Sequence, residues 1–160
     1  MQIDTTMLPA RGSDAVEILK NDHKVIKSLL NKLAEAEPSE REEVLEQLKG
    51  VLTIHNATEE NLVYPAINKL AKSKPESDRL YHETAAADVL VFELDSLLKE
   101  GKDREFTTKA EQFQDAVLHH IEEEEQKALP RLEENTDPEQ AETLTGAVRA
   151  FRKSLHFETG

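Results

Sequence analysis

The segment HNATEENLVYP, residues 55–65, gives the first indication of how this chain is built. A second segment, HIEEEEQKALP at residues 120–130, keeps the histidine, two adjacent glutamates and the proline at the same offsets. A His and a Glu four residues apart lie one turn apart on the same face of a helix, where both can reach one metal ion. The repeat therefore predicts two helices that each present a His–Glu pair.

Composition narrows the class of protein. The chain has 160 residues, of which 38% are hydrophobic and 33% charged, with only 5 Phe and 2 Tyr as aromatic residues. This balance favours a single helical domain. Because there is no cysteine, disulfides and thiolate metal sites are excluded, and any metal must take nitrogen and oxygen ligands.

Charge and hydropathy bear on partners and location. A net charge of -13 argues against a nucleic-acid partner and against an anionic membrane surface, since both require clusters of Lys and Arg. The N-terminus has no basic segment followed by an apolar one, and nowhere do 18 apolar residues run together. We therefore expect a cytoplasmic protein.

Apolar residues recur at helical spacing in four segments, and the exceptions in each stripe are His and Glu. The first stripe begins after Ser13 or Asp14, and the third runs from about Pro75 to Glu100. The inward residues predicted for the four helices are, in order, Val16, Leu19, His23, Ile26, Leu30 and Leu33; Val44, Leu48, Val51, His55, Glu59, Leu62 and Ala66; His82, Ala86, Val89 and Leu97; and Phe113, Val117, His120, Glu124 and Ala128.

These stripes predict an all-α fold, an antiparallel up-down four-helix bundle over residues 13–135. Residues 1–12 are expected to form a flexible arm, and residues 136–160 a short additional helix packed on the bundle. Within each predicted hairpin, the two histidines are nearly the same number of residues from the turn, so their heights along the bundle differ by only about 3 Å. For the histidines of the second and third helices, the same count gives heights that differ by about 16 Å. Pro65 should also kink the second helix.

The polar residues on the four stripes form one candidate metal site. Burying them without partners would be costly, and imidazole with carboxylate suits iron, manganese or zinc. His119 is disfavoured because its own face of the helix is polar, whereas Tyr64, Tyr81 and Glu93 are interpreted as packing or solvent-contacting residues. The Glu-x-x-His spacing of ferritin-like di-iron bundles is absent. The predicted ligands are His23, His55, Glu59, His82, His120 and Glu124.

The sequence resembles the hemerythrin-like, or HHE cation-binding, domain over about residues 15–133. The resemblance rests on Asp22-His23, residues 55–65, His82-Glu83 and residues 120–130. It implies two non-haem iron ions with an oxo or hydroxo bridge, held by the four histidines as terminal ligands and by the two glutamates as bridging ligands. The longer His-to-carboxylate spacing of oxygen-carrying hemerythrins leaves Glu125 as an alternative to Glu124.

The resemblance also implies a function at the metal ions. Oxygen carriers of this family have a further histidine at the position of Ala86, so one iron should be more open here. We expect a protein that binds or reduces oxygen, nitric oxide or peroxide, or that supplies labile iron in a stress response. The alternative is a metal-dependent sensor or interaction module without turnover, in which the C-terminal helix meets a protein partner.

Overall fold

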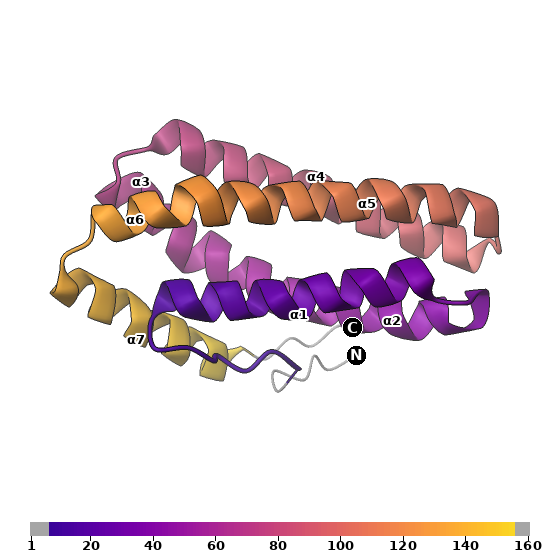
Figure 1. Ribbon diagram of the computed structural model, residues 1–160, viewed down its shortest axis with the longest axis horizontal. Coiled ribbons are helices and arrows are strands. Elements are labelled where there is room, and N and C mark those ends of the chain that lie inside the picture. Colours follow the sequence, from indigo (N-terminus) through magenta and orange to yellow (C-terminus); the bar gives the residue numbers. More distant parts are fainter. Residues whose placement is uncertain (1–6, 156–160) are drawn as a thin grey trace.

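The protein, described by a computed structural model over residues 7–155, is a bundle of antiparallel helices (Figure 1). No strand occurs in this part of the chain, which confirms the expected all-α class. Two hairpins form the bundle, α1 with α2 and α4 with α5. The helical elements are α1 (Ala15–Glu35), η2 (Pro38–Glu40), α2 (Arg41–Thr58), η3 (Glu59–Val63), α3 (Tyr64–Leu70), α4 (Lys74–Lys99), α5 (Asp103–Glu123), η4 (Glu124–Ala128), α6 (Leu129–Glu134) and α7 (Pro138–Ser154).

Both copies of the repeated segment contain a π-helical turn that begins at the predicted glutamate ligand. The Tyr64 N–H donates to the Glu59 carbonyl, and the Leu129 N–H donates to the Glu124 carbonyl, each five residues back. A proline follows at the start of α3 and again at the start of α6. Because proline has no N–H and crowds the carbonyl four residues earlier, a wider turn allows each helix to continue. The two segments thus share the same backbone conformation as well as the same sequence pattern.

The apolar core consists of two main clusters along the bundle. Ile26, Leu48 and Phe113 belong to the larger cluster, which also includes Leu94 of α4. The second cluster contains Leu19 and packs α1 against α3, α4 and α6. His23 lies between Leu19 and Ile26 on the same face of α1, so the polar site is positioned between two apolar layers.

Helix α4 faces the core with a different side from the one expected. Leu80, Thr84 and Leu94 are buried, whereas His82 is exposed and Phe92 is 73% exposed. His82 lies two residues from both Leu80 and Thr84, a rotation of about 200° around the helix. The expectation that His82 points inward is therefore corrected by the packing of α4.

The segment before α1 packs against the protein. Leu8 is buried in the larger cluster, and Arg149 of α7 donates to the carbonyls of Ala10 and Gly12. This differs from the flexible arm expected over residues 1–12, of which residues 1–6 lie outside the described part of the chain. Gly12 has φ +144°, a conformation that side chains rarely adopt, and a Cβ there would meet the backbone of Ile18 at 2.7 Å.

Helix α7 runs beside α1 and also contacts α2 (Figure 1). Asp137 caps its first turn by accepting from the Gln140 N–H, and Val148 is fully buried on the face toward the bundle. The C-terminal helix predicted for residues 136–160 is present as far as Ser154, and residues 156–160 lie outside the described range. Within residues 7–155, no helix has both the length and the apolar character needed to cross a membrane.

A candidate metal site between the two hairpins

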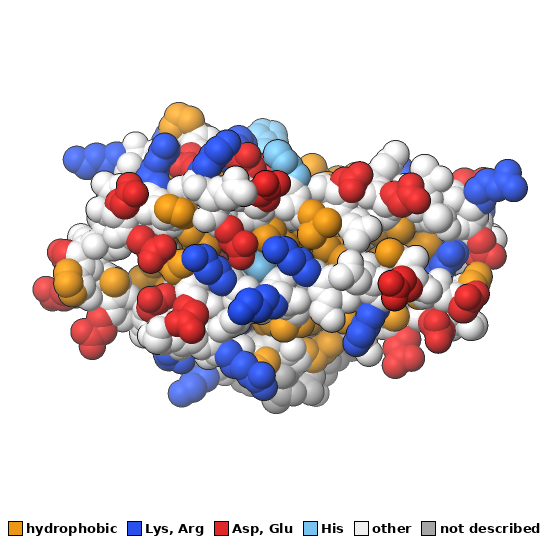
Figure 2. Space-filling model, in the orientation of Figure 1, with side chains coloured by type: hydrophobic (Ala, Val, Ile, Leu, Met, Phe, Trp, Pro, Cys, Tyr) orange, Lys and Arg blue, Asp and Glu red, His pale blue; other side chains and the backbone are white. Residues whose placement is uncertain are grey.

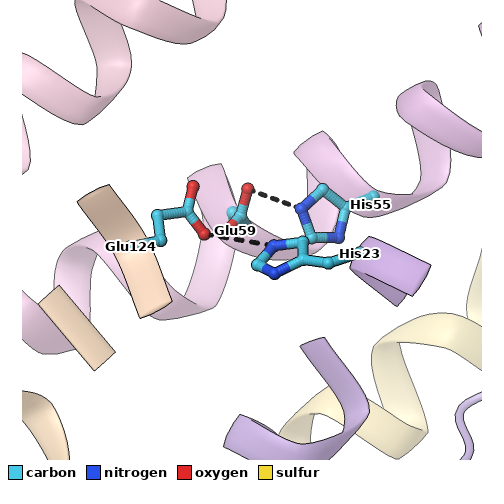
Figure 3. Close-up of side chains that lie close together, drawn as sticks. All are labelled: His23, His55, Glu59 and Glu124. Atoms are coloured by element: carbon cyan, nitrogen blue, oxygen red, sulfur yellow. Dashed lines mark ion pairs between the residues drawn. The ribbon is translucent and has the colours of Figure 1, made fainter. Parts of the chain in front are cut away.

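Four side chains from four helical elements meet inside the bundle (Figure 3). His23 comes from α1, His55 from α2, and Glu59 and Glu124 from the first residues of the two π turns. One ligand atom from each residue lies within 4.8 Å of the others. All four residues are almost completely inaccessible to solvent, with at most 2% of each residue exposed. This is the geometry of a site for one cation.

The contacts within the cluster join the two hairpins. His55 Nε2 lies 2.9 Å from Glu59 Oε1 within the first hairpin, and His23 Nε2 lies 3.4 Å from Glu124 Oε2 across the bundle. The other oxygen of Glu124, Oε1, contacts His120 Nε2. The Glu124 carboxylate therefore lies between two imidazoles from different helices, as a bridging ligand must.

Each imidazole of the site has a second carboxylate behind it. His55 Nδ1 lies 2.9 Å from Asp22 Oδ2, and His23 Nδ1 lies 3.1 Å from Glu125 Oε1. His120 Nδ1 lies 3.4 Å from Glu83 Oε2. This arrangement fixes the ring orientation and directs Nε2 into the site, as outer carboxylates do for metal-bound histidines.

The structure also separates the glutamates that the sequence left as alternatives. Glu124 is buried and contacts the Nε2 side of the rings, whereas the side chain of Glu125 is 28% exposed and contacts the far side of His23. Glu124 is therefore the candidate ligand, and Glu125 orients a ligand. His119 is exposed on the outer face of α5, as its polar face predicted.

Tyr64 is a member of the site that sequence reasoning interpreted as packing. Its hydroxyl lies 3.1 Å from Glu59 Oε1, 3.0 Å from Glu124 Oε1 and 3.0 Å from His120 Nε2. Thr84 of α4 is a further neighbour at 3.3 Å. The sequence signal was the spacing of five from Glu59, which a π turn returns to the same side of the helix.

The other two residues interpreted as packing or solvent-contacting lie outside the ligand cluster. Tyr81 packs edge-on against the Tyr64 ring and donates to the Glu60 carbonyl. Glu93 forms a surface ion pair with Lys109.

The two buried carboxyls have opposite pKa shifts. Burial, together with the charge of Glu124, raises the pKa of Glu59 to about 7. Burial acts to raise the pKa of Glu124 as well, but the neighbouring Glu59 carboxyl and the His120 and His23 imidazoles outweigh burial and hold this pKa well below its usual range. Glu59 is therefore the carboxyl of the pair that takes up a proton first as the pH falls, because two adjacent buried carboxylates repel each other.

Two imidazoles of the site, those of His55 and His120, have raised pKa values. Burial by itself lowers the pKa of His55, but the charge of Glu59 and the hydrogen bond to Asp22 raise it well above its ordinary value. For His120, hydrogen bonds to Glu124 and Glu83 overcome burial and raise the pKa to about 10. Protons thus neutralise the carboxylates where a metal ion would do so.

Three buried polar atoms of the cluster have no hydrogen-bond partner: His23 Nε2, Glu59 Oε2 and Glu124 Oε2. Such atoms are rare in folded proteins because leaving them unsatisfied costs free energy. All three belong to residues of the cluster, and imidazole nitrogen with carboxylate oxygen is a donor set for iron, manganese or zinc. The site therefore fits a metal ion.

Five of the six predicted ligands are brought together around this centre, with His120 joined to the group of four through Glu124. His82 is the exception, because α4 presents Thr84 to the site and turns His82 outward.

Fold and site together define a metal-binding helical bundle. The sequence matches the hemerythrin HHE cation binding domain family over residues 14–132. Since this match covers well over half of the chain, the protein belongs to that family.

A DNA nickase from Nostoc sp. (strain PCC 7120 / SAG 25.82 / UTEX 2576) is 22% identical over 145 residues. The aligned part is 90% of this chain but 40% of the nickase, so the chain spans less than half of that relative's length. No solved structure matches the sequence.

Proposed function

We propose that this chain is a non-haem di-iron protein that binds or reduces a small ligand, namely oxygen, nitric oxide or peroxide, or supplies labile iron. The observation that carries the proposal is that three of the four clustered residues each keep a buried polar atom without a hydrogen-bond partner, next to imidazoles that are each backed by a carboxylate. In this proposal the ligands are His23, His55, Glu59, His120 and Glu124.

Two ions are proposed because the donors fall into two groups. The first ion would lie among the four residues of the compact cluster. The second would lie on the opposite side of Glu124, where Oε1 faces His120 and the Tyr64 hydroxyl. With fewer protein ligands there, the second ion has more positions for an exogenous ligand.

A small cavity beside the centre favours a ligand of two or three atoms. It lies between His55 and His120 and is otherwise lined largely by apolar side chains, among them Ile26, Val91 and Val117. Its volume is about 20 Å³, and roughly 10–15 Å³ is enough for one water molecule. An organic substrate is therefore too large for it.

The residues around the cavity can assist such a ligand. Iron, when bound, supplies electrons and an open coordination position. The Tyr64 hydroxyl is placed to exchange a proton with either carboxylate, and the apolar lining limits the entry of water. Location in the cytoplasm is part of this proposal and rests on the sequence.

The cavity can be tested with two valines of α4. Val91 lines it, whereas Val89 is 57% exposed on another side of the same helix. Val91→Phe should slow binding of nitric oxide to the reduced, iron-loaded protein by at least about tenfold while the iron content stays unchanged, because the ring fills the cavity. Val89→Phe is the matched control. Stopped-flow rates that are equal in both variants would refute a ligand path through this cavity.

Nicking of DNA is not carried over from the Nostoc relative. A net charge of -13 opposes the approach of a phosphate backbone, and the face drawn in Figure 2 shows acidic and basic side chains interspersed. We propose that supercoiled plasmid stays intact with the iron-loaded protein. Metal-dependent nicking that disappears in Glu124→Gln would overturn this part of the proposal.

The alternative function, a metal-dependent sensor without turnover, is supported by the contacts of α7 near the site. Deleting the chain after Thr136 would not separate the two functions, because α7 buries Val148 and contacts side chains beside the ligands. Turnover of peroxide by the iron-loaded protein would exclude the sensor, because a sensor binds metal but leaves peroxide unconsumed.

A further inference from the structure

Arg152 is a buried arginine on α7, a helix that begins after the segment matched by the family ends at residue 132. Its side chain is 5% exposed. Two of its guanidinium nitrogens donate to the Asp22 carboxylate, with Nη1 3.0 Å from Oδ1 and Nη2 in contact with Oδ2. Asp22 itself is 1% exposed, and its Oδ2 lies 2.9 Å from His55 Nδ1.

The same guanidinium also contacts the second helix. Arg152 Nε donates to Thr58 Oγ1 at 2.9 Å, and Thr58 directly precedes Glu59 at the start of the π turn. A further bond from Nη1 reaches the Leu8 carbonyl at 3.3 Å. One side chain of α7 therefore contacts the residue that orients His55 and the residue that precedes Glu59.

We propose that Arg152 is a positioning residue of the metal site, which acts through Asp22 to hold His55 and through Thr58 to hold the start of the Glu59 turn. Helix α7 is then a functional part of the site. The inference rests on the proposed metal-binding function and extends it to a residue outside the matched domain.

Packing of α7 does not by itself explain this ion pair. Burying two charges costs desolvation free energy that apolar side chains of similar size would avoid. The helix already has other contacts, through Val148 and through the bonds of Arg149 to Ala10 and Gly12. What distinguishes Arg152 is that its carboxylate partner also holds an imidazole of the site.

The test compares Arg152→Gln with Arg149→Gln, two arginines on the same helix with different partners. Metal-free protein is titrated with Co²⁺ against a chromophoric chelator, and the visible spectrum of the cobalt form is recorded. Arg152→Gln should weaken Co²⁺ binding by about 10–100-fold, the usual effect of losing an outer carboxylate contact. Its cobalt bands should also shift, because the His55 ring is no longer held. Arg149→Gln should change neither quantity.

A double variant keeps the test valid if the single variant leaves Asp22 as an unpaired buried charge. Asp22→Asn with Arg152→Gln removes both charges, and the proposal predicts a combined loss of affinity smaller than the product of the two single losses, since both residues act on His55 through the same contact while Thr58 is reached by Arg152 alone.

The outcomes are distinguishable. Equal affinity and equal spectra for wild type and Arg152→Gln, or the same loss in Arg149→Gln, would refute the positioning role alone. Failure of the wild type to bind Co²⁺ would remove the proposed metal site and this inference together.

Discussion

The two hairpins of the bundle contain the same local motif but contribute unequally to the site. The first hairpin supplies His23, His55 and Glu59, all almost completely buried. The second hairpin supplies Glu124, which is equally buried, and His120, whose side chain is 12% exposed. Its helix α4 supplies no buried histidine. A repeated segment thus fixes its own local geometry, whereas the contribution of the neighbouring helix depends on how that helix is rotated.

The largest expected effect is on the residue that joins the hairpins. Glu124→Gln should weaken metal binding by up to roughly 1,000-fold, because about 10–16 kcal/mol of binding free energy shared by four or five ligands is about 2–4 kcal/mol for each. Isothermal titration of the metal-free protein measures this. Glu125→Gln, one residue on, is the matched control and should lose about tenfold or less. Equal losses would place the wrong glutamate in the site.

The next comparison is between one histidine of each hairpin. His23→Ala should weaken metal binding more than His120→Ala, because His23 lies within the compact cluster whereas His120 is attached to it through Glu124. We expect metal affinity to fall roughly 100-fold or more in His23→Ala, and we expect the loss in His120→Ala to be about ten times smaller. The same titration measures both, and the reverse order would contradict the inequality of the hairpins.

A third prediction concerns the pH dependence of the metal-free protein. The pKa of Glu59 is raised from 4.5 to about 7, so the folded state keeps a proton that the unfolded chain releases. This contribution to stability is full below about pH 4.5 and is lost as the pH rises through 7. Glu59→Gln cannot ionise, so its stability relative to wild type should rise by about 3 kcal/mol between pH 4.5 and 8.

Urea unfolding of both proteins in the presence of a chelator gives this difference at each pH. Groups whose pKa does not depend on Glu59 titrate equally in the two proteins and cancel, whereas His55 and Glu124 contribute to the measured difference. A stability difference that does not change with pH would mean that Glu59 carries no excess proton.

A smaller effect is expected from Tyr64, which lies between the carboxylates of both hairpins. Tyr64→Phe removes the hydroxyl but keeps the ring, so the metal-free protein should lose about 1–2 kcal/mol of unfolding free energy. The bound metal should remain, with a shifted optical spectrum. Urea unfolding and absorption spectra measure the two effects, and unchanged values in both would remove Tyr64 from the site.

The smallest effect is expected at His82, which the sequence predicted as a ligand and which the structure shows exposed. His82→Ala should leave metal affinity and stability within about twofold of wild type, the range of an ordinary surface substitution. A loss comparable to that of His23→Ala would mean that α4 turns inward when metal binds.

The strongly amphipathic helices were predictable from the sequence. Helix α1 has one apolar stripe, so the inward position of His23 followed from periodicity alone. The choice of His120 over His119 followed in the same way. The match of the two H-x-x-x-E segments predicted Glu59 and Glu124, and the structure brings both into one cluster.

Helix α4 was not predictable by this reasoning, because it carries apolar residues on two sides. Leu80 and Leu94 face the core, while Val89 and Phe92 are exposed, and periodicity cannot choose between the stripes. Two of the outer carboxylates, Asp22 and Glu83, were missed for a different reason. Asp22 and Glu83 contact rings of other helices, and no spacing within one helix reports such a contact.

Anaerobic titration of the metal-free protein with Fe²⁺ measures whether the buried cluster holds two iron ions. We expect the wild type to saturate at about two ions per chain, and we expect no site of comparable affinity in Glu124→Gln. Saturation at one ion would contradict the di-iron centre. No binding by the wild type would contradict the metal site itself.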